Sequence, residues 1–184
     1  MQSIFKSYKF RNITISGRAA NGATTLARSL AKKLNWSLVL AGEIVREYMK
    51  MNNIPLELTS QTSDQYHLEL DDLIKNKLKN ENNLIIESWL SGFDAQNIPG
   101  VFKIFITCSD DAVRIDRLMN RDKITLEQAK QHIKIREEEN LKKWEKLYHT
   151  RDIWNPKYYD LVIDTYKLGP EETLEKTLST IGFN

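Results

Sequence analysis

Nine residues near the start of the chain decide its fold: Gly17-Arg18-Ala19-Ala20-Asn21-Gly22-Ala23-Thr24-Thr25. They follow a short run, Phe10–Ser16, in which Ile13 and Ile15 alternate with polar residues, as in a strand. After them, apolar residues recur at helical spacing up to Leu34. A strand, a glycine-bounded loop and a helix in this order have the spacing of the phosphate-binding pattern G-x-x-x-x-G-K-[ST].

Most of this loop fits the pattern, but one position does not. Gly17 and Gly22 allow unusual backbone angles, and the amides from Asn21 to Thr25 would cradle phosphate at the start of a helix. Thr24 stands where a hydroxyl would bind magnesium. Ala23 stands where the pattern has a lysine that contacts the β- and γ-phosphates. We therefore expect binding to survive and catalysis to weaken. Taken alone, the loop fits an ordinary strand–turn–helix equally well.

Strands and helices alternate along the rest of the chain, which predicts a parallel sheet flanked by helices. The predicted strands are 10–16, 36–40, 84–87, 101–107 and 161–164, and the predicted helices are 24–34, 42–51, 59–78, 110–119, 125–148 and 170–181. No linker or repeat divides the sequence. The prediction is a single three-layer α/β domain over residues 1–184, with a sheet of about five strands.

The composition excludes several classes of protein. With 41% hydrophobic and 28% charged residues, the balance is that of a globular chain rather than a disordered one. A net charge of +2 argues against a nucleic-acid binder held by phosphate neutralisation. No apolar stretch is long enough for a membrane span, so we expect a cytoplasmic protein. The single cysteine, Cys108, ends an apolar run and is interpreted as a buried strand-end residue.

Several further segments, in their order and spacing, resemble the cytidylate kinase family, especially its short, archaeal-type branch. They include Ala41–Glu47 (AGEIVRE), Glu87–Gly92 (ESWLSG), Asn120–Asp122 (NRD) and Tyr159–Thr165 (YDLVIDT). The resemblance covers nearly the whole chain, from about Ile13 to Ile181. It implies a P-loop nucleoside-monophosphate kinase fold, with an acceptor-binding helical insertion at about 55–79 and a lid at about 121–151.

The resemblance also implies roles for particular residues. Arg46 would hold the phosphate of the acceptor nucleotide, and Asp64 and Asp71 would read its base. The candidate catalytic residues are the lid arginines, which would close over the transferred phosphoryl group: Arg117, Arg121 and Arg136. Exposed surface positions are an equally good interpretation of the two aspartates.

Two cations expected from the resemblance are absent, because Ala23 replaces the loop lysine and Trp89 replaces the arginine after Glu87. Arg18, inside the loop, would restore some of the charge, although arginine is longer and planar. Trp89 either stacks on a base or, as we expect, packs.

The sequence thus predicts transfer of phosphate from ATP to CMP or dCMP with magnesium, weakened by Ala23 and Trp89. One alternative is a pseudoenzyme that binds nucleotide and acts through a protein partner. Another is a P-loop kinase for a different small acceptor.

Overall fold

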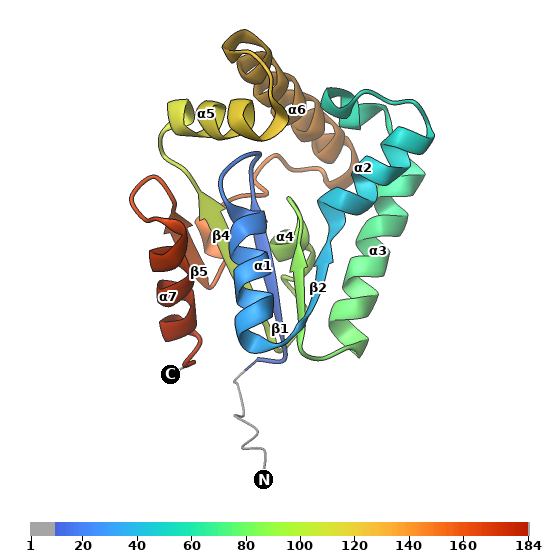
Figure 1. Cartoon of the computed structure of the whole chain (residues 1–184). Helices are drawn as coiled ribbons and strands as arrows, with labels where there is room; N and C mark the ends of the chain where they lie inside the picture. Colours follow the sequence, from blue (N-terminus) through green and yellow to red (C-terminus); the bar gives the residue numbers. More distant parts are fainter. Residues whose placement is uncertain (1–9, 184) are drawn as a thin grey trace.

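A five-stranded parallel sheet forms the centre of the molecule, in the order β2-β3-β1-β4-β5. The structure, a computed structural model, describes residues 10–183 (Figure 1). The strands are β1 (Asn12–Gly17), β2 (Ser37–Leu40), β3 (Leu84–Glu87), β4 (Val101–Thr107) and β5 (Leu161–Asp164). The predicted α/β class and the strand number are confirmed.

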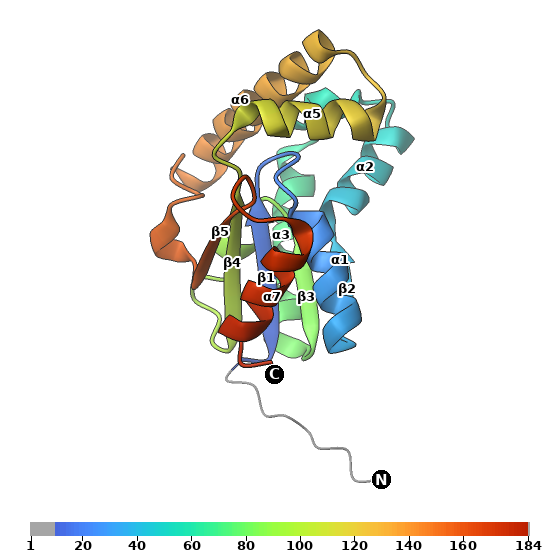
Figure 2. The same cartoon turned by 60° about the vertical axis from the view of Figure 1, so that its left-hand side comes forward.

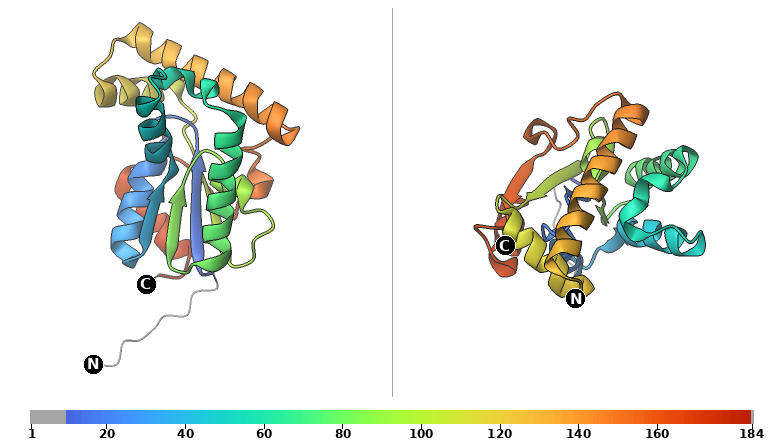
Figure 3. Two further views of the ribbon diagram at one scale, coloured as in Figure 1. Left: turned by 90° about the vertical axis from the view of Figure 1, so that its right-hand side faces the viewer. Right: turned by 90° about the horizontal axis from the view of Figure 1, so that it is seen from above.

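Helices cover both faces of the sheet and its carboxyl-terminal edge. They are α1 (Ala23–Leu34), α2 (Ala41–Met51), α3 (Asp64–Asn80), α4 (Ser91–Asp94), α5 (Asp111–Asp122), α6 (Leu126–Tyr148) and α7 (Pro170–Thr180), with 3-10 turns η1 (Leu56–Gln61) and η2 (Pro156–Tyr158). In Figure 2, α1 and α7 lie on one face of the sheet and α3 on the other. Seen from above, α6 runs across the ends of the strands (Figure 3).

Two of the three apolar cores of residues 10–183 lie on opposite sides of the sheet. Ile13, Ile15 and Ile85 pack with α1 and α7, whereas Leu84 and Ile86 pack with α3. Residues of β3 therefore alternate between the two cores, which explains why this strand is a continuous apolar run. Because all strands are parallel, the loops after their carboxyl ends meet at one edge, beneath α5 and α6.

Most predicted element boundaries hold within two or three residues, and the exception lies before α3. The pattern predicts a helix from about Thr59, but α3 begins at Asp64, because the Ser63 hydroxyl accepts a hydrogen bond from the Tyr66 amide and caps it. Residues 56–61 form η1 instead, against α6. The short helix α4, which the sequence analysis does not predict, follows β3 directly.

Candidate active site

The loop between β1 and α1 depends on both of its glycines. A Cβ on Gly17 would collide with the Asn21 side-chain amide and would lie 2.5 Å from the Ile106 carbonyl oxygen. Gly22 has a φ of 96°, in the left-handed region that favours glycine. These glycines let the chain turn from the end of β1 into the first turn of α1.

Asn21 holds this loop together from within. Its side chain is 2% exposed, and its Nδ2 donates to the Ile106 carbonyl on β4. Its Oδ1 accepts a 3.1 Å hydrogen bond from the Ala23 amide. One of the expected phosphate-binding amides therefore already has a partner, and the other amides of the first turn of α1 are the donors that a phosphate would meet.

Thr24 and Glu87 bring a hydroxyl and a carboxylate together at the mouth of the loop. The Thr24 hydroxyl donates to Glu87 Oε2 at 3.1 Å. Burial at the end of β3 raises the pKa of Glu87, although the Thr24 hydrogen bond and the charge of Arg46 oppose that rise. Hard oxygen ligands of this kind fit Mg²⁺, which is usually bound through one or two protein groups plus phosphates and water. Within residues 10–183 there is no cluster of three or more His, Cys, Asp or Glu that would hold a metal by itself.

A cavity of about 820 Å³ opens beside the loop and joins it to α2, α3 and α6. Its lining includes the loop residues from Arg18 to Thr25, together with Glu87, Trp89 and Asp71. Six arginines also line it: Arg18, Arg28, Arg46, Arg117, Arg121 and Arg136. So many guanidinium groups around one hollow favour a ligand with several negative charges.

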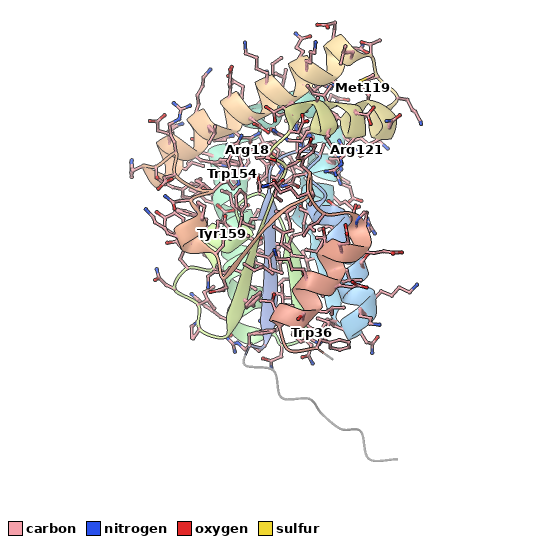
Figure 4. All side chains as sticks on the ribbon, turned by 90° about the vertical axis from the view of Figure 1, so that its left-hand side faces the viewer. Arg18, Trp36, Met119, Arg121, Trp154 and Tyr159 are labelled. Atoms are coloured by element: carbon pink, nitrogen blue, oxygen red, sulfur yellow. The ribbon has the colours of Figure 1, made fainter. Side chains whose placement is uncertain are left out.

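Arg18 and Arg117 are held by residues of other segments. Arg18 lies 4.9 Å from the centre of the Trp154 ring and 3.6 Å from Glu137 Oε2, so its charge is partly compensated (Figure 4). Arg117 donates to the hydroxyl of Thr165 at 2.9 Å and to its carbonyl at 3.0 Å. The Thr165 hydroxyl in turn donates to the Asn21 carbonyl at 2.7 Å, which links Arg117 to the loop.

The other two lid candidates, Arg121 and Arg136, differ in their surroundings. Arg121 makes paired hydrogen bonds of 2.7 and 2.9 Å with the neighbouring Asp122. Arg136 lies 5.4 Å from the centre of the Trp89 ring. Burial, and then the charges of Arg121 and Arg46, lower the pKa of Arg136 to about 10.

Two of the three residues expected to bind the acceptor nucleotide, Arg46 and Asp71, line the cavity, and Asp64 does not. Arg46 on α2 lines the cavity and lies 3.9 Å from Glu43. Asp71 also lines it, and its carboxylate accepts a hydrogen bond from the Tyr148 hydroxyl. Asp64, the first residue of the same helix α3, pairs instead with Lys143 and Lys146 of α6 and is not part of the lining.

Two aspects of the site are not found by the sequence analysis. Glu87 receives no role there, although a carboxylate that ends a buried strand next to a phosphate loop is a signal for one. Arg114, which is 2% exposed, donates from Nε to the Ala19 carbonyl at 3.1 Å and pairs with Glu137. No local pattern distinguishes Arg114 from the other charges of α5.

A parallel sheet with a glycine-bounded loop between β1 and α1, and an arginine-lined cavity above it, defines the class of P-loop kinases. A solved shikimate kinase from Acinetobacter baumannii has the same fold, with a TM-score of 0.60 over 95% of this chain and 94% of that one, at 14% identity. Comparison of sequences shows which family within this class the chain belongs to. Residues 12–167 match the model of the cytidylate kinase-like family, and the chain belongs to that family.

Curated relatives agree with this assignment. The chain is 37% identical over 162 residues to a protein named cytidylate kinase from Pyrococcus abyssi, covering 86% of this chain and 87% of the relative. It is 32% identical over 172 residues to a protein of the same name from Haloarcula marismortui, covering 92% and 88%. In the described part of the chain, no helix is long and apolar enough to cross a membrane.

Proposed function

We propose that this protein transfers the γ-phosphoryl group of ATP to the 5′-phosphate of a nucleoside monophosphate, with CMP or dCMP as the preferred acceptor. An oxygen of the acceptor phosphate attacks the γ-phosphorus, the bond from that phosphorus to the bridging oxygen of ADP breaks, and the products are ADP and a nucleoside diphosphate. One observation carries the proposal: a single cavity is lined by the phosphate loop, by Arg46 and Asp71, and by the arginines of α5 and α6.

The donor would bind along the loop. Amides at the start of α1 would hold its phosphates, as a helix N-terminus does for anions in general. Thr24 and Glu87 would hold magnesium, which supplies positive charge to the phosphate oxygens when it is bound. Thr165 and Arg117 brace the loop from the opposite side through the Asn21 carbonyl.

The acceptor would bind at α2 and α3. Arg46 would pair with its phosphate, because a guanidinium group matches phosphate geometry with two hydrogen bonds. Asp71 offers a carboxylate, and a carboxylate accepts a hydrogen bond from the exocyclic amino group of cytosine. Uracil has a carbonyl oxygen at that position, so the same carboxylate would favour CMP over UMP.

Charge neutralisation would fall to arginines in place of the absent lysine. A loose, in-line transition state needs positive charge around the transferred group, and little covalent chemistry from the protein. Arg121 and Arg136 reach the cavity from α5 and α6 and are the groups that we assign to this task. Because they come from α5 and α6 and not from the loop that would hold ATP, we expect them to stabilise the phosphoryl group during its transfer more than bound ATP.

A second candidate function is nucleotide binding without turnover, in a protein that acts through a protein partner. Two observations favour it: Ala23 brings no cation to the loop, and the Ala23 amide is already bonded to Asn21. Under this alternative the cavity would bind nucleotide and the chemistry would be absent.

A coupled ADP-release assay separates the two candidates. ATP would be supplied with CMP, dCMP, UMP, AMP and GMP in turn, with and without magnesium. We expect turnover with CMP or dCMP above the ATPase background, and a smaller rate with UMP. Absence of turnover with every acceptor, in a protein that binds ATP by calorimetry, would favour the alternative.

A further inference from the structure

Three tryptophans from distant parts of the chain meet beside the cavity. Trp89, which follows β3, lies edge-on to Trp144 of α6 and to Trp154, with ring centres 5.6 and 5.8 Å apart. Trp144 and Trp154 are 5.6 Å apart and nearly perpendicular, at 88°. The Trp154 indole N–H also donates to the Trp89 carbonyl at 3.1 Å. We call these three residues the tryptophan cluster.

Two arginines lie over rings of this cluster, and they differ in whether a carboxylate lies at ion-pair distance. Arg18, over Trp154, has a carboxylate partner in Glu137, which also pairs with the buried Arg114. Arg136, over Trp89, has no ion pair with any residue in the range 10–183, and its buried Nε lacks a hydrogen-bond partner there. Of the two, Arg136 is the one with no carboxylate at ion-pair distance among residues 10–183, and the charges of Asp122 and Glu137 act on it only from farther away.

The difference matters because an aromatic face and a carboxylate hold a cation in different ways. A carboxylate orients a guanidinium group and cancels its charge. An indole face attracts the cation through the ring quadrupole and leaves the charge and the N–H edges available to an anion. Arg121 and Arg46 repel the Arg136 charge as well, so the cost of keeping the three together falls when an anion arrives.

We propose that Trp89 is a positioning residue, whose indole face holds the Arg136 guanidinium toward the cavity for the phosphate chain of the ligand. This inference rests on the proposed function, because it assigns the phosphates to that cavity. This role explains why the Trp89 ring lies at the cavity wall against the Arg136 guanidinium. Packing alone would not require an arginine in that place. Trp89 would act through Arg136 and not by contact with the nucleotide.

The test uses inorganic tripolyphosphate, a base-free anion, with binding measured by calorimetry. Trp89→Leu and Arg136→Met should each weaken binding by about 10-fold, the scale of one charge-assisted contact. The double variant should bind no worse than Arg136→Met alone, because the indole acts only through the guanidinium. Trp89→Phe, which keeps an aromatic face, should lose less than about threefold.

Trp36→Leu, at the other end of the sheet, is the matched control and should bind tripolyphosphate normally (Figure 4). Circular dichroism would confirm that each variant is folded. Should Trp89→Leu fail to fold, the same cycle is run with Trp89→Met and Arg136→Met, because methionine also lacks an aromatic face. A loss from Trp89→Met that is absent, or that persists fully in the Arg136→Met background, overturns the proposal. Losses that add in the original double variant overturn it too, as does unchanged binding by Trp89→Leu.

Failure of the proposed function gives a different pattern. If the tripolyphosphate cycle shows the expected coupling but the ADP-release assay shows no transfer with any acceptor, Trp89 positions Arg136 in a protein that is not a kinase. If transfer proceeds and the cycle shows no coupling, the function stands and the role of Trp89 is refuted.

Discussion

Arg114 Nε donates a hydrogen bond of 3.1 Å to the backbone carbonyl of Ala19, and this contact joins α5 to the phosphate loop. The same guanidinium group bonds to Asp111 at 2.7 Å and to Glu137 of α6. A side chain on α5 thus holds the loop and α6 at once. The arrangement is buried, since the Arg114 and Glu137 side chains are 3% and 14% exposed.

Arg114→Met should therefore destabilise the fold. Removing one partner of a buried ion pair costs about 3–5 kcal/mol when the other charge is left uncompensated. Arg18, 3.6 Å from Glu137, compensates that carboxylate in part, so this range is the upper bound of the expected loss. Urea unfolding followed by circular dichroism would measure the change. Lys130→Met is the control, because its pair with Glu127 is exposed and should contribute less than about 1 kcal/mol. Equal effects of the two substitutions would show that the buried pair has no special weight.

Glu87→Gln should weaken metal binding in the presence of ATP. The variant keeps the shape of the side chain beside Thr24 and removes its negative charge. We expect the affinity for Mn²⁺, used as a spectroscopic substitute for Mg²⁺ in the complex with ATP, to fall at least about tenfold. Electron paramagnetic resonance measures free Mn²⁺ directly. Glu43→Gln removes an equal charge from the cavity wall at a carboxylate that bonds to Arg28 and not to Thr24, and a similar loss there would argue against a specific role for Glu87.

Arg46→Ala should weaken CMP binding and leave ATP binding almost unchanged. Loss of a charged hydrogen bond costs about 1.5–3 kcal/mol, or roughly 10- to 150-fold in the dissociation constant. Titration calorimetry with each nucleotide alone measures both values. Lys50→Ala, on the last turn of the same helix, removes a cation outside the cavity lining and should change neither. Equal losses for CMP and ATP in Arg46→Ala would assign this arginine to the fold.

Ala23→Lys should raise turnover. Ala23 lines the cavity, and an ammonium group at this position would add charge beside the β- and γ-phosphates. We expect kcat to rise about tenfold, equal to about 1.4 kcal/mol of transition-state stabilisation. Ser179→Lys, an exposed position on α7, adds the same charge far from the site. An unchanged or lower kcat in Ala23→Lys would mean that the arginines already meet the need for charge.

Asp94→Asn should stabilise the protein at high pH more than at low pH. Asp94 is buried, its Oδ1 lies 3.5 Å from Lys75 Nζ, and its Oδ2 has no hydrogen-bond partner among residues 10–183. Burial, and then the charge of Asp71, raise the pKa of Asp94 well above its usual range.

A raised pKa means that the folded state binds the proton more tightly than the unfolded state, so this carboxyl favours folding below about pH 4. That contribution is lost as the pH rises through the folded-state pKa. We expect Asp94→Asn to raise the free energy of unfolding by about 1–2 kcal/mol at pH 8 and to change it little at pH 4. Asp116→Asn, exposed on α5, should show no such dependence on pH, and the same slope in both variants would contradict the assignment.

The fold is predictable from the sequence because its signals are local. The apolar run Leu84–Glu87 and the glycines of the loop each imply a backbone geometry by themselves. The start of α3 is not predicted correctly, because the helical pattern extends back to Thr59 and the Ser63 cap decides the boundary. The boundary differs by about five residues, because the cap fixes the first turn of the helix whatever the apolar spacing before it.

The site is less predictable, since its contacts join residues far apart in the chain. The positions of Thr24 and Arg46 on the cavity wall follow from spacing and resemblance, and the structure places both there. The partners of Arg18 and Arg136 do not, because Trp89 and Trp154 reach them only through the packing of α6 over the sheet. Asp64 and Asp71 look equivalent on a helical face, and only the position of α6 separates them.

The tryptophan cluster has a practical consequence for solution work. The chain has four tryptophans, and the cluster contains three of them, within edge contact of one another and beside two guanidinium groups. Trp36 lies at the opposite end of the sheet (Figure 4). Three of the four indole rings that contribute to intrinsic fluorescence therefore lie beside the cavity, and Trp89 and Trp144 are part of its lining. A ligand that displaces Arg136 or Arg18 would alter the emission without any attached dye, against a constant background from Trp36.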